Sequence, residues 1–208
     1  MGLITRKPAV LVLEDGSVFE GFSLGKIGVA TGEICYNTGM TGYQEIYTDP
    51  SYFGQIIINT SSHIGNYGTV EDEQESSSPQ ISGVIINEYS EIYSRSNSDE
   101  SLEDYFIKNN TVAIYDIDTR KLVKYIRDKG AMNAIISSES QDVEKLKSSL
   151  DKVPSMKNLE LSSKVTTEKE YEFGDKNSKI KIAVLDLGCK QSILKNFSVR
   201  GALCKVFP

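Results

Sequence analysis

A polar segment rich in Lys and Glu, Pro154 to Asn177, separates two parts of the chain that carry different apolar patterns. Before it, short apolar runs alternate first with turn residues and then with helical patterns. After it come one strand, one helix and one more strand. Polar segments that join differently patterned parts are typical of linkers between domains. The sequence therefore predicts one domain over residues 1–155, a linker over 156–179 and the beginning of a second domain over 180–208.

The first part is rich in strand patterns. Ala9–Leu13 and Val18–Phe22 flank the turn Glu14–Ser17, which predicts a β-hairpin. Gln55–Asn59 contains three consecutive isoleucines and is expected to be buried on both faces. Further strands are expected at Gly32–Tyr36, Ile81–Asn87, Thr111–Tyr115 and Asn133–Ile136. The acidic, Ser-rich segment Glu71–Pro79 is expected to be an exposed loop.

Three helices are predicted between and after these strands, because apolar side chains recur with the spacing of one helical face. Ser98 is expected to cap a helix over Asp99–Asn109. Asp118 is expected to cap a second over Thr119–Lys129, which ends at Gly130. A third spans about Asp142–Lys152. Strands packed against helices make this part a mixed α/β domain.

The second part has the pattern of a parallel α/β sheet at its beginning. Its elements are an apolar strand Ile180–Leu187, a tight turn at Gly188, a helix Lys190–Arg200 ending at Gly201, and a strand Ala202–Phe207. A sheet of two strands and one helix cannot bury both faces. We therefore expect this domain to be cut short and its apolar strand to aggregate or to seek a partner.

Charge and composition exclude several classes of protein. The net charge of −6 and pI near 5.0 argue against a nucleic-acid partner, because phosphate binding needs clustered Lys and Arg. No stretch approaches the roughly 20 apolar residues of a membrane span, and the N-terminus lacks a cleavable leader pattern. Three widely spaced cysteines favour a reducing cytoplasm over a disulfide framework or a zinc site.

Phosphate and metal sites are also unsupported by the sequence. The glycines of the first part do not precede a helix in a phosphate-binding arrangement. Glu45, Asp116 and Asp118 could suggest a metal cluster, but separate turn and capping roles explain them more simply. We expect no metal site.

Several segments together resemble one protein family. They are L-V-L-E-D-G at 11–16, Y-N-T-G-M-T-G-Y-Q-E-I-Y-T-D-P-S-Y at 36–52, H-I-G-N-Y-G at 63–68, and A-I-Y-D-I-D-T-R-K-L at 113–122 followed by R-D-K-G-A at 127–131. Over residues 8–155 they resemble the N-terminal domain of the small, glutamine-hydrolysing subunit of carbamoyl-phosphate synthetase. D-L-G-C-K-Q-S-I-L at 186–194 resembles the start of that family's class I glutamine amidotransferase domain.

The resemblance implies a swivelling β/β/α-type first domain and a truncated, flavodoxin-like amidotransferase domain from near Ile180. It implies a subunit that hydrolyses glutamine through a cysteine thioester and passes ammonia to a large subunit, which makes carbamoyl phosphate for arginine and pyrimidine synthesis. ATP and magnesium belong to the large subunit, so no cofactor is expected here. The family's G-x-C-x-G-H-Q nucleophile turn and its later His and Glu are missing from this sequence. We therefore expect no catalytic residue and no activity of this chain alone.

Ser51 is the candidate ligand-binding residue. On residue patterns alone, Asp49-Pro50-Ser51 reads as a turn. The resemblance implies instead that the Ser51 hydroxyl contacts substrate L-glutamine in the neighbouring domain, where a hydroxyl can both donate and accept.

Two other residues are of types that can act as catalytic groups. Cys189 follows a strand and a glycine and opens a helix, where thiolates can be stabilised. His63, the only histidine, could serve as its base in a self-contained hydrolase. A structural role fits His63 better, and the resemblance places the nucleophile in a later turn than Cys189.

The competing hypothesis is a non-catalytic interaction protein. A naturally short homologue could dock on the large synthetase subunit without hydrolysing glutamine. Continuation of the reading frame into a nucleophile turn would favour the enzyme, and a stop codon after Pro208 would favour this alternative.

Overall fold

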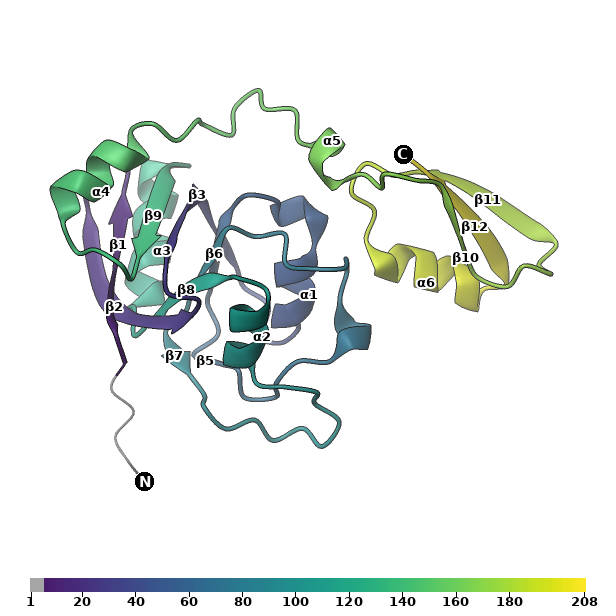
Figure 1. Ribbon diagram of the computed structural model, residues 1–208, viewed down its shortest axis with the longest axis horizontal. Coiled ribbons are helices and arrows are strands. Elements are labelled where there is room, and N and C mark those ends of the chain that lie inside the picture. Colours follow the sequence, from purple (N-terminus) through teal and green to yellow (C-terminus); the bar gives the residue numbers. More distant parts are fainter. Residues whose placement is uncertain (1–5) are drawn as a thin grey trace.

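The computed structural model describes residues 6–208, and within them seven strands close into a barrel (Figure 1). Neighbouring strands follow the order β1-β2-β8-β6-β4-β3-β9, and β9 pairs with β1 to complete the ring. Their bounds are β1 Pro8–Leu13, β2 Val18–Gly25, β3 Val29–Asn37, β4 Ile56–Asn59, β6 Gly83–Ile85, β8 Val112–Tyr115 and β9 Asn133–Ser137. The expected mixed α/β fold is confirmed, with a closed barrel as its sheet.

Strand β4 shows how the barrel separates two cores. It lies between parallel neighbours β3 and β6. Because successive side chains of a strand point to opposite faces, Ile56 and Ile58 join the barrel interior while Ile57 packs outside it. All three isoleucines are fully buried, as the sequence predicted.

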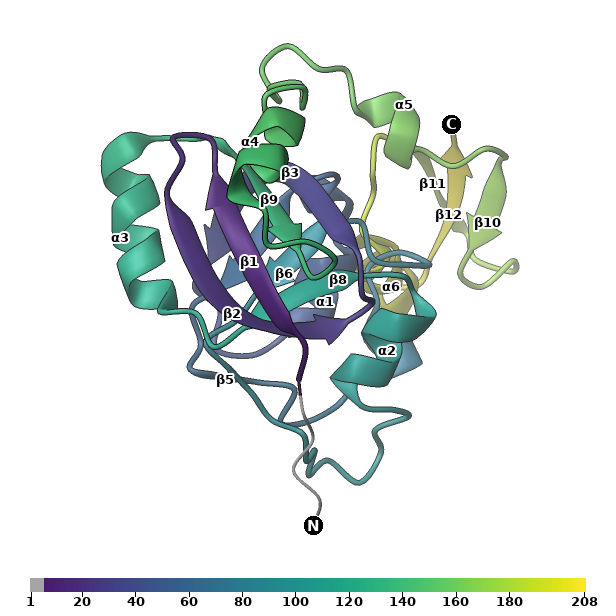
Figure 2. The same cartoon turned by 60° about the vertical axis from the view of Figure 1, so that its left-hand side comes forward.

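Helices cover the outside of this barrel (Figures 1 and 2). Tyr47 of one helix and Phe106 of another form the outer core with Ile57. Leu146 and Leu150 of a third pack on β1 and β9. The helices are α1 Tyr43–Thr48, α2 Leu102–Lys108, α3 Thr119–Lys129 and α4 Val143–Leu150, with 3-10 turns η1 Pro50–Tyr52 and η2 Glu71–Glu73.

The sequence prediction of the helix starts was right at two places and wrong at one. Asp118 and Asp142 cap α3 and α4, accepting from the backbone N–H three residues on at 2.9 and 3.1 Å. Helix α2 instead begins at Leu102 and is capped by Ser101, whose hydroxyl accepts from the Asp104 N–H at 3.1 Å. Ser98 lies three residues before this cap, and its hydroxyl donates to the carbonyl of Tyr67.

Short elements escaped the sequence analysis. Helix α1 and the two-stranded sheet of β5 His63–Ile64 and β7 Glu88–Tyr89 were not predicted. Two-residue strands and a six-residue helix are too short for periodicity to reveal them.

A second, separate sheet follows the barrel and is joined to it through the segment that contains α5, Ser162–Val165 (Figures 1 and 2). Its order is β10-β12-β11, with β11 parallel to β12 and β10 antiparallel to it. The bounds are β10 Tyr171–Phe173, β11 Ile180–Leu185, α6 Gln191–Val199 and β12 Ala202–Phe207.

The predicted strand–helix–strand unit is thus present, with a third strand that the sequence analysis missed. Strand β10 lies inside residues 156–179, which we expected to be a linker, so part of that segment belongs to the second sheet. One face of the sheet packs on α6 through Leu194, Cys204 and Val206. Within residues 6–208, no helix combines the length and the apolar character needed to cross a bilayer.

Candidate functional site

Ser51 lies in the 3-10 turn η1 that follows helix α1. Asp49 caps this turn, and its Oδ1 accepts from the Ser51 N–H at 2.9 Å. Pro50 occupies the first position of the turn, where its missing N–H costs nothing. The Ser51 side chain is exposed to solvent while Asp49 and Pro50 are buried. The turn therefore holds the hydroxyl at the surface on a rigid base.

The same turn contacts the second sheet. The Lys190 Nζ lies 3.3 Å from the Asp49 Oδ2, with Asp49 mostly buried and Lys190 about two-fifths exposed. A methyl group on Gly188 would lie 3.1 Å from the Cβ of Pro50 and 2.9 Å from the Cγ2 of Val165. Ser51 therefore sits at the junction of the barrel with the turn between β11 and α6.

Asp186 fixes the shape of that β11–α6 turn. Its Oδ1 accepts from the N–H groups of Gly188 and Cys189 at 3.0 and 2.7 Å, and its Oδ2 accepts from the Thr167 N–H at 2.8 Å. The carboxylate is buried, so these three bonds offset its loss of water. Gly188 has a φ of +96°, which side chains other than glycine rarely adopt. The turn that meets Pro50 is thus rigid on its own side as well.

Cys189 does not have the environment of a nucleophile. Burial first, and then the nearby Asp186 carboxylate, raise the pKa of the Cys189 thiol. A reactive cysteine needs the opposite shift, because the thiolate is the nucleophile. The side chain packs instead into the small core beneath α6.

His63 has a partner of its own, away from Cys189. It lies on β5, in the two-stranded sheet, and its Nδ1 is 3.1 Å from the Glu88 Oε2 on the neighbouring strand. Cys189 follows β11 in a different sheet. The structure therefore does not bring together the pair that a self-contained hydrolase would require.

The three acidic residues considered as metal ligands have separate surroundings. Asp118 caps α3, and Asp116 stands in a turn with a φ of +66°. Burial raises the pKa of Glu45 on α1. Over residues 6–208, no group of three or more His, Cys, Asp or Glu side chains is arranged to hold a metal ion.

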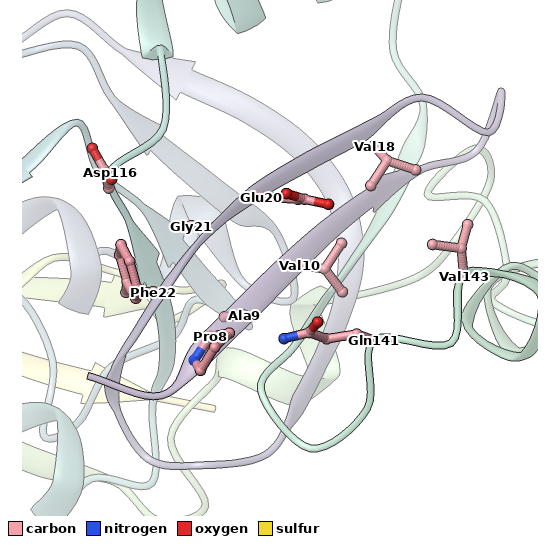
Figure 3. A pocket seen from close by; sticks show the side chains of 10 residues that line it. All are labelled: Pro8, Ala9, Val10, Val18, Glu20, Gly21, Phe22, Asp116, Gln141 and Val143. Atoms are coloured by element: carbon pink, nitrogen blue, oxygen red, sulfur yellow. The ribbon is translucent and has the colours of Figure 1, made fainter. Parts of the chain in front are cut away.

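A cavity of about 440 Å³ lies elsewhere on the barrel, between the β1–β2 hairpin and the approach to α4 (Figure 3). Val10, Val18 and Val143 line it together with Glu20 and Gln141. None of the residues of the Ser51 junction borders this cavity. The candidate site is therefore the contact between two turns and not this hollow.

Sequence reasoning missed three residues of the junction: Asp186, Lys190 and Glu75, whose Oε2 accepts from the Ser192 N–H of α6 at 2.9 Å. Asp186 carried a signal, since an aspartate that ends an apolar strand before a glycine commonly binds the turn's N–H groups. Glu75 and Lys190 carried none, because their partners lie 117 and 141 residues away.

The sequence of this chain is similar to those of proteins from one family. Residues 11–136 match the family described as "Carbamoyl-phosphate synthase small chain, CPSase domain". Proteins named "Carbamoyl phosphate synthase small chain" are 40% identical in Synechococcus sp., 43% in Chlorobaculum tepidum and 42% in Aquifex aeolicus. These alignments cover 100%, 96% and 98% of this chain but 56%, 54% and 58% of those relatives. The chain thus spans about half the length of the relatives it matches.

Proposed function

We propose, from the premise that this chain belongs to the carbamoyl-phosphate synthase small-chain family, that it forms part of a subunit that hydrolyses glutamine and delivers ammonia to a large subunit for carbamoyl phosphate synthesis. Its share is the barrel, which docks and completes the glutamine site, and the beginning of the amidotransferase domain. The cysteine, histidine and glutamate of the hydrolytic reaction belong to the portion of the relatives that this chain does not span. No step of the hydrolysis is assigned to the residues present here.

The fold supports the assignment of separate roles to the barrel and to the second part of the chain. We propose that residues 1–155 form the family's swivelling β/β/α-type domain and that the second sheet, which includes β10, begins a flavodoxin-like amidotransferase domain. The parallel pairing of β11 with β12 around α6 is the repeating unit of such a sheet. We further propose a cytoplasmic protein of arginine and pyrimidine synthesis whose ATP and magnesium are bound by the large subunit.

One observation carries the glutamine assignment: the exposed Ser51 stands where the barrel meets the β11–α6 turn. In open α/β sheets, ligands bind outside the carboxyl ends of the strands. Residues Asp186 to Cys189 lie at that end of β11. A hydroxyl on the neighbouring domain can therefore bind a substrate held there, and we propose that Ser51 donates to the carboxylate or accepts from the ammonium of L-glutamine.

The test is the Ser51→Ala variant in the complete subunit, assayed with its large chain. Loss of one hydrogen bond to a charged group, about 1.5–3 kcal/mol, would raise the Michaelis constant for glutamine about 10- to 100-fold. Synthesis from free ammonia should be unchanged, because it bypasses the glutamine site. Ser148→Ala on α4 is the control, since among residues 6–208 the Ser148 hydroxyl bonds only to the Glu144 carbonyl of its own helix. A glutamine Michaelis constant equal to that of the unaltered enzyme would remove Ser51 from the site.

Docking can be tested on this chain directly. The purified chain is mixed with the purified large chain and analysed by size-exclusion chromatography with light scattering. A one-to-one complex is the expected result. Its absence, with the barrel folded, would mean that docking needs residues outside this chain.

A further inference from the structure

The loop Glu71–Pro79, hereafter the acidic loop, reaches from the barrel to the first turn of α6. The Glu75 carbonyl accepts from the Gln191 N–H at 2.9 Å, and the Glu75 Oε2 accepts from the Ser192 N–H at 2.9 Å. The Lys195 Nζ donates to the Asp72 carbonyl at 2.6 Å. We predicted this loop to be simply exposed, and that is wrong for Glu75, which is half-buried.

These bonds supply what α6 lacks in its own sequence. The first N–H groups of a helix have no partner within the helix and are usually satisfied by a neighbouring side chain at the N-cap. The N-cap of α6 is Lys190, whose side chain cannot accept a hydrogen bond and makes none there. Glu75 therefore caps α6 from another part of the chain, and its negative charge suits the positive end of the helix dipole.

The acidic loop is anchored on the residue next to the Ser51 turn. The Glu75 N–H donates to the Thr48 Oγ1 at 2.8 Å, and the Ser76 hydroxyl donates to the Thr48 carbonyl at 2.6 Å. Thr48 is fully buried and ends α1, and Asp49 and the Ser51 turn follow at once. One residue thus holds both the cap of α6 and the base of the turn that carries Ser51.

We propose that Glu75 is a positioning residue that docks α6 on the barrel and thereby sets the β11–α6 turn opposite Ser51. The link to glutamine rests on the proposed function of Ser51, whereas the docking itself does not. The Asp49–Lys190 ion pair and the Pro50–Gly188 contact join the same two parts of the chain. Unlike these two contacts, Glu75 binds backbone N–H groups of α6 directly and so fixes the orientation of the helix.

Amide hydrogen exchange, resolved by NMR on this chain, tests the docking. In Glu75→Ala the Ser192 N–H loses its acceptor, but the Gln191 N–H keeps the backbone carbonyl of residue 75 as long as the two parts stay docked. We expect exchange to rise about tenfold at both amides, the change that corresponds to about 1.4 kcal/mol. A rise confined to Ser192 would show a local cap without docking and would overturn the proposal.

Two further variants keep this test sharp. Glu75→Gln retains an oxygen that can accept from the Ser192 N–H, so it should restore most of the protection. Glu71→Ala removes the same charge from the same loop, and within residues 6–208 the Glu71 carboxylate makes no hydrogen bond or ion pair, so it should change neither amide. An effect of Glu71→Ala equal to that of Glu75→Ala would attribute the result to loop charge and contradict the proposal. Protection of the Ile57 amide in the barrel confirms that each variant is folded.

Kinetics in the complete subunit separate positioning from the proposed function. Glu75→Ala should raise the glutamine Michaelis constant about tenfold and leave ammonia-dependent synthesis unchanged, because the substrate contact is misplaced while the large subunit is untouched. If exchange rises as expected but the Michaelis constant stays constant, the positioning role is overturned. If Ser51→Ala is silent while Glu75→Ala undocks α6, the assignment of Ser51 fails and the docking role of Glu75 stands.

Discussion

The barrel and the second sheet both contain apolar strands, but they differ at their strand edges. The barrel is closed and has no unpaired edge, whereas the second sheet is open and has two. In the barrel every strand has a neighbour on both sides, and Leu11 on β1 and Ile57 on β4 are fully buried. Closure removes the unpaired edges that otherwise recruit other chains. The barrel and the helices packed on it therefore enclose their own cores.

The second sheet keeps both of its edges. Strand β11 is an edge strand, and Ile180 and Leu185 on it are 57% and 65% exposed. Its small core lies only between the sheet and α6. We infer that the barrel is stabilised by its own packing. The second sheet is stabilised in large part by the contacts that Glu75, Asp49 and Pro50 of the barrel make with it.

The largest expected effect compares one leucine from each region. Leu11→Ala opens a cavity in a closed core and should cost about 2–5 kcal/mol of unfolding free energy. Leu185→Ala changes an exposed side chain and should cost less than about 0.5 kcal/mol. Urea unfolding followed by circular dichroism measures both. Similar costs for the two leucines would break the comparison, because they would show that β11 is as well packed as β1.

An intermediate effect is expected from two glycines of the second sheet. Gly188 and Gly201 have φ values of +96° and +81°. A methyl group at Gly188 would meet Val165 and Pro50, whereas one at Gly201 would meet none of the described residues within 4 Å. Gly201→Ala should cost about 1–2 kcal/mol for backbone strain alone. Gly188→Ala should add about 1–3 kcal/mol for the clash. The local opening free energy of β12, from amide exchange, measures the difference between them.

The outcome in the barrel sharpens this test. Barrel amides should keep their protection in both variants, since the clash is relieved by moving the second sheet away. Loss of protection in β4 with Gly188→Ala would mean that the two regions unfold together, and the contrast between them would not hold.

The sequence predicted the self-contained region better than the dependent one. The β1–β2 hairpin, the doubly buried Ile56–Ile58 and the Asp118 cap follow from local rules that act over a few residues. Strand β10 was missed because Tyr171–Phe173 sits in a polar segment and becomes a strand only through pairing with β12. Tertiary pairing overrides local preference in such a case.

The residues of the candidate site also differ in how far the sequence could predict them. Ser51 could be singled out only through the family resemblance of its neighbours, because its residue pattern is that of any turn. Glu75 could not be found at all, since its acceptor atoms meet backbone N–H groups, which every sequence contains. A residue that acts by binding a distant backbone leaves no mark in composition or spacing.

The smallest expected effect concerns the ion pair between the two regions. Lys190→Met should weaken the docking of α6 by only about 0.2–1 kcal/mol, because Lys190 is partly exposed and such pairs contribute little. The same loss should appear in the unaltered chain when salt is raised from low to molar concentration, since ions screen an exposed charge. Amide exchange of Gln191 measures both changes. Lys205→Met is the matched control, because Lys205 on β12 pairs at 3.2 Å with Glu170, the residue before β10. If Lys190→Met undocks α6 more strongly than Glu75→Ala, the junction is held by charge and not by the capped helix. The second sheet would then be tied to the barrel in a salt-dependent way.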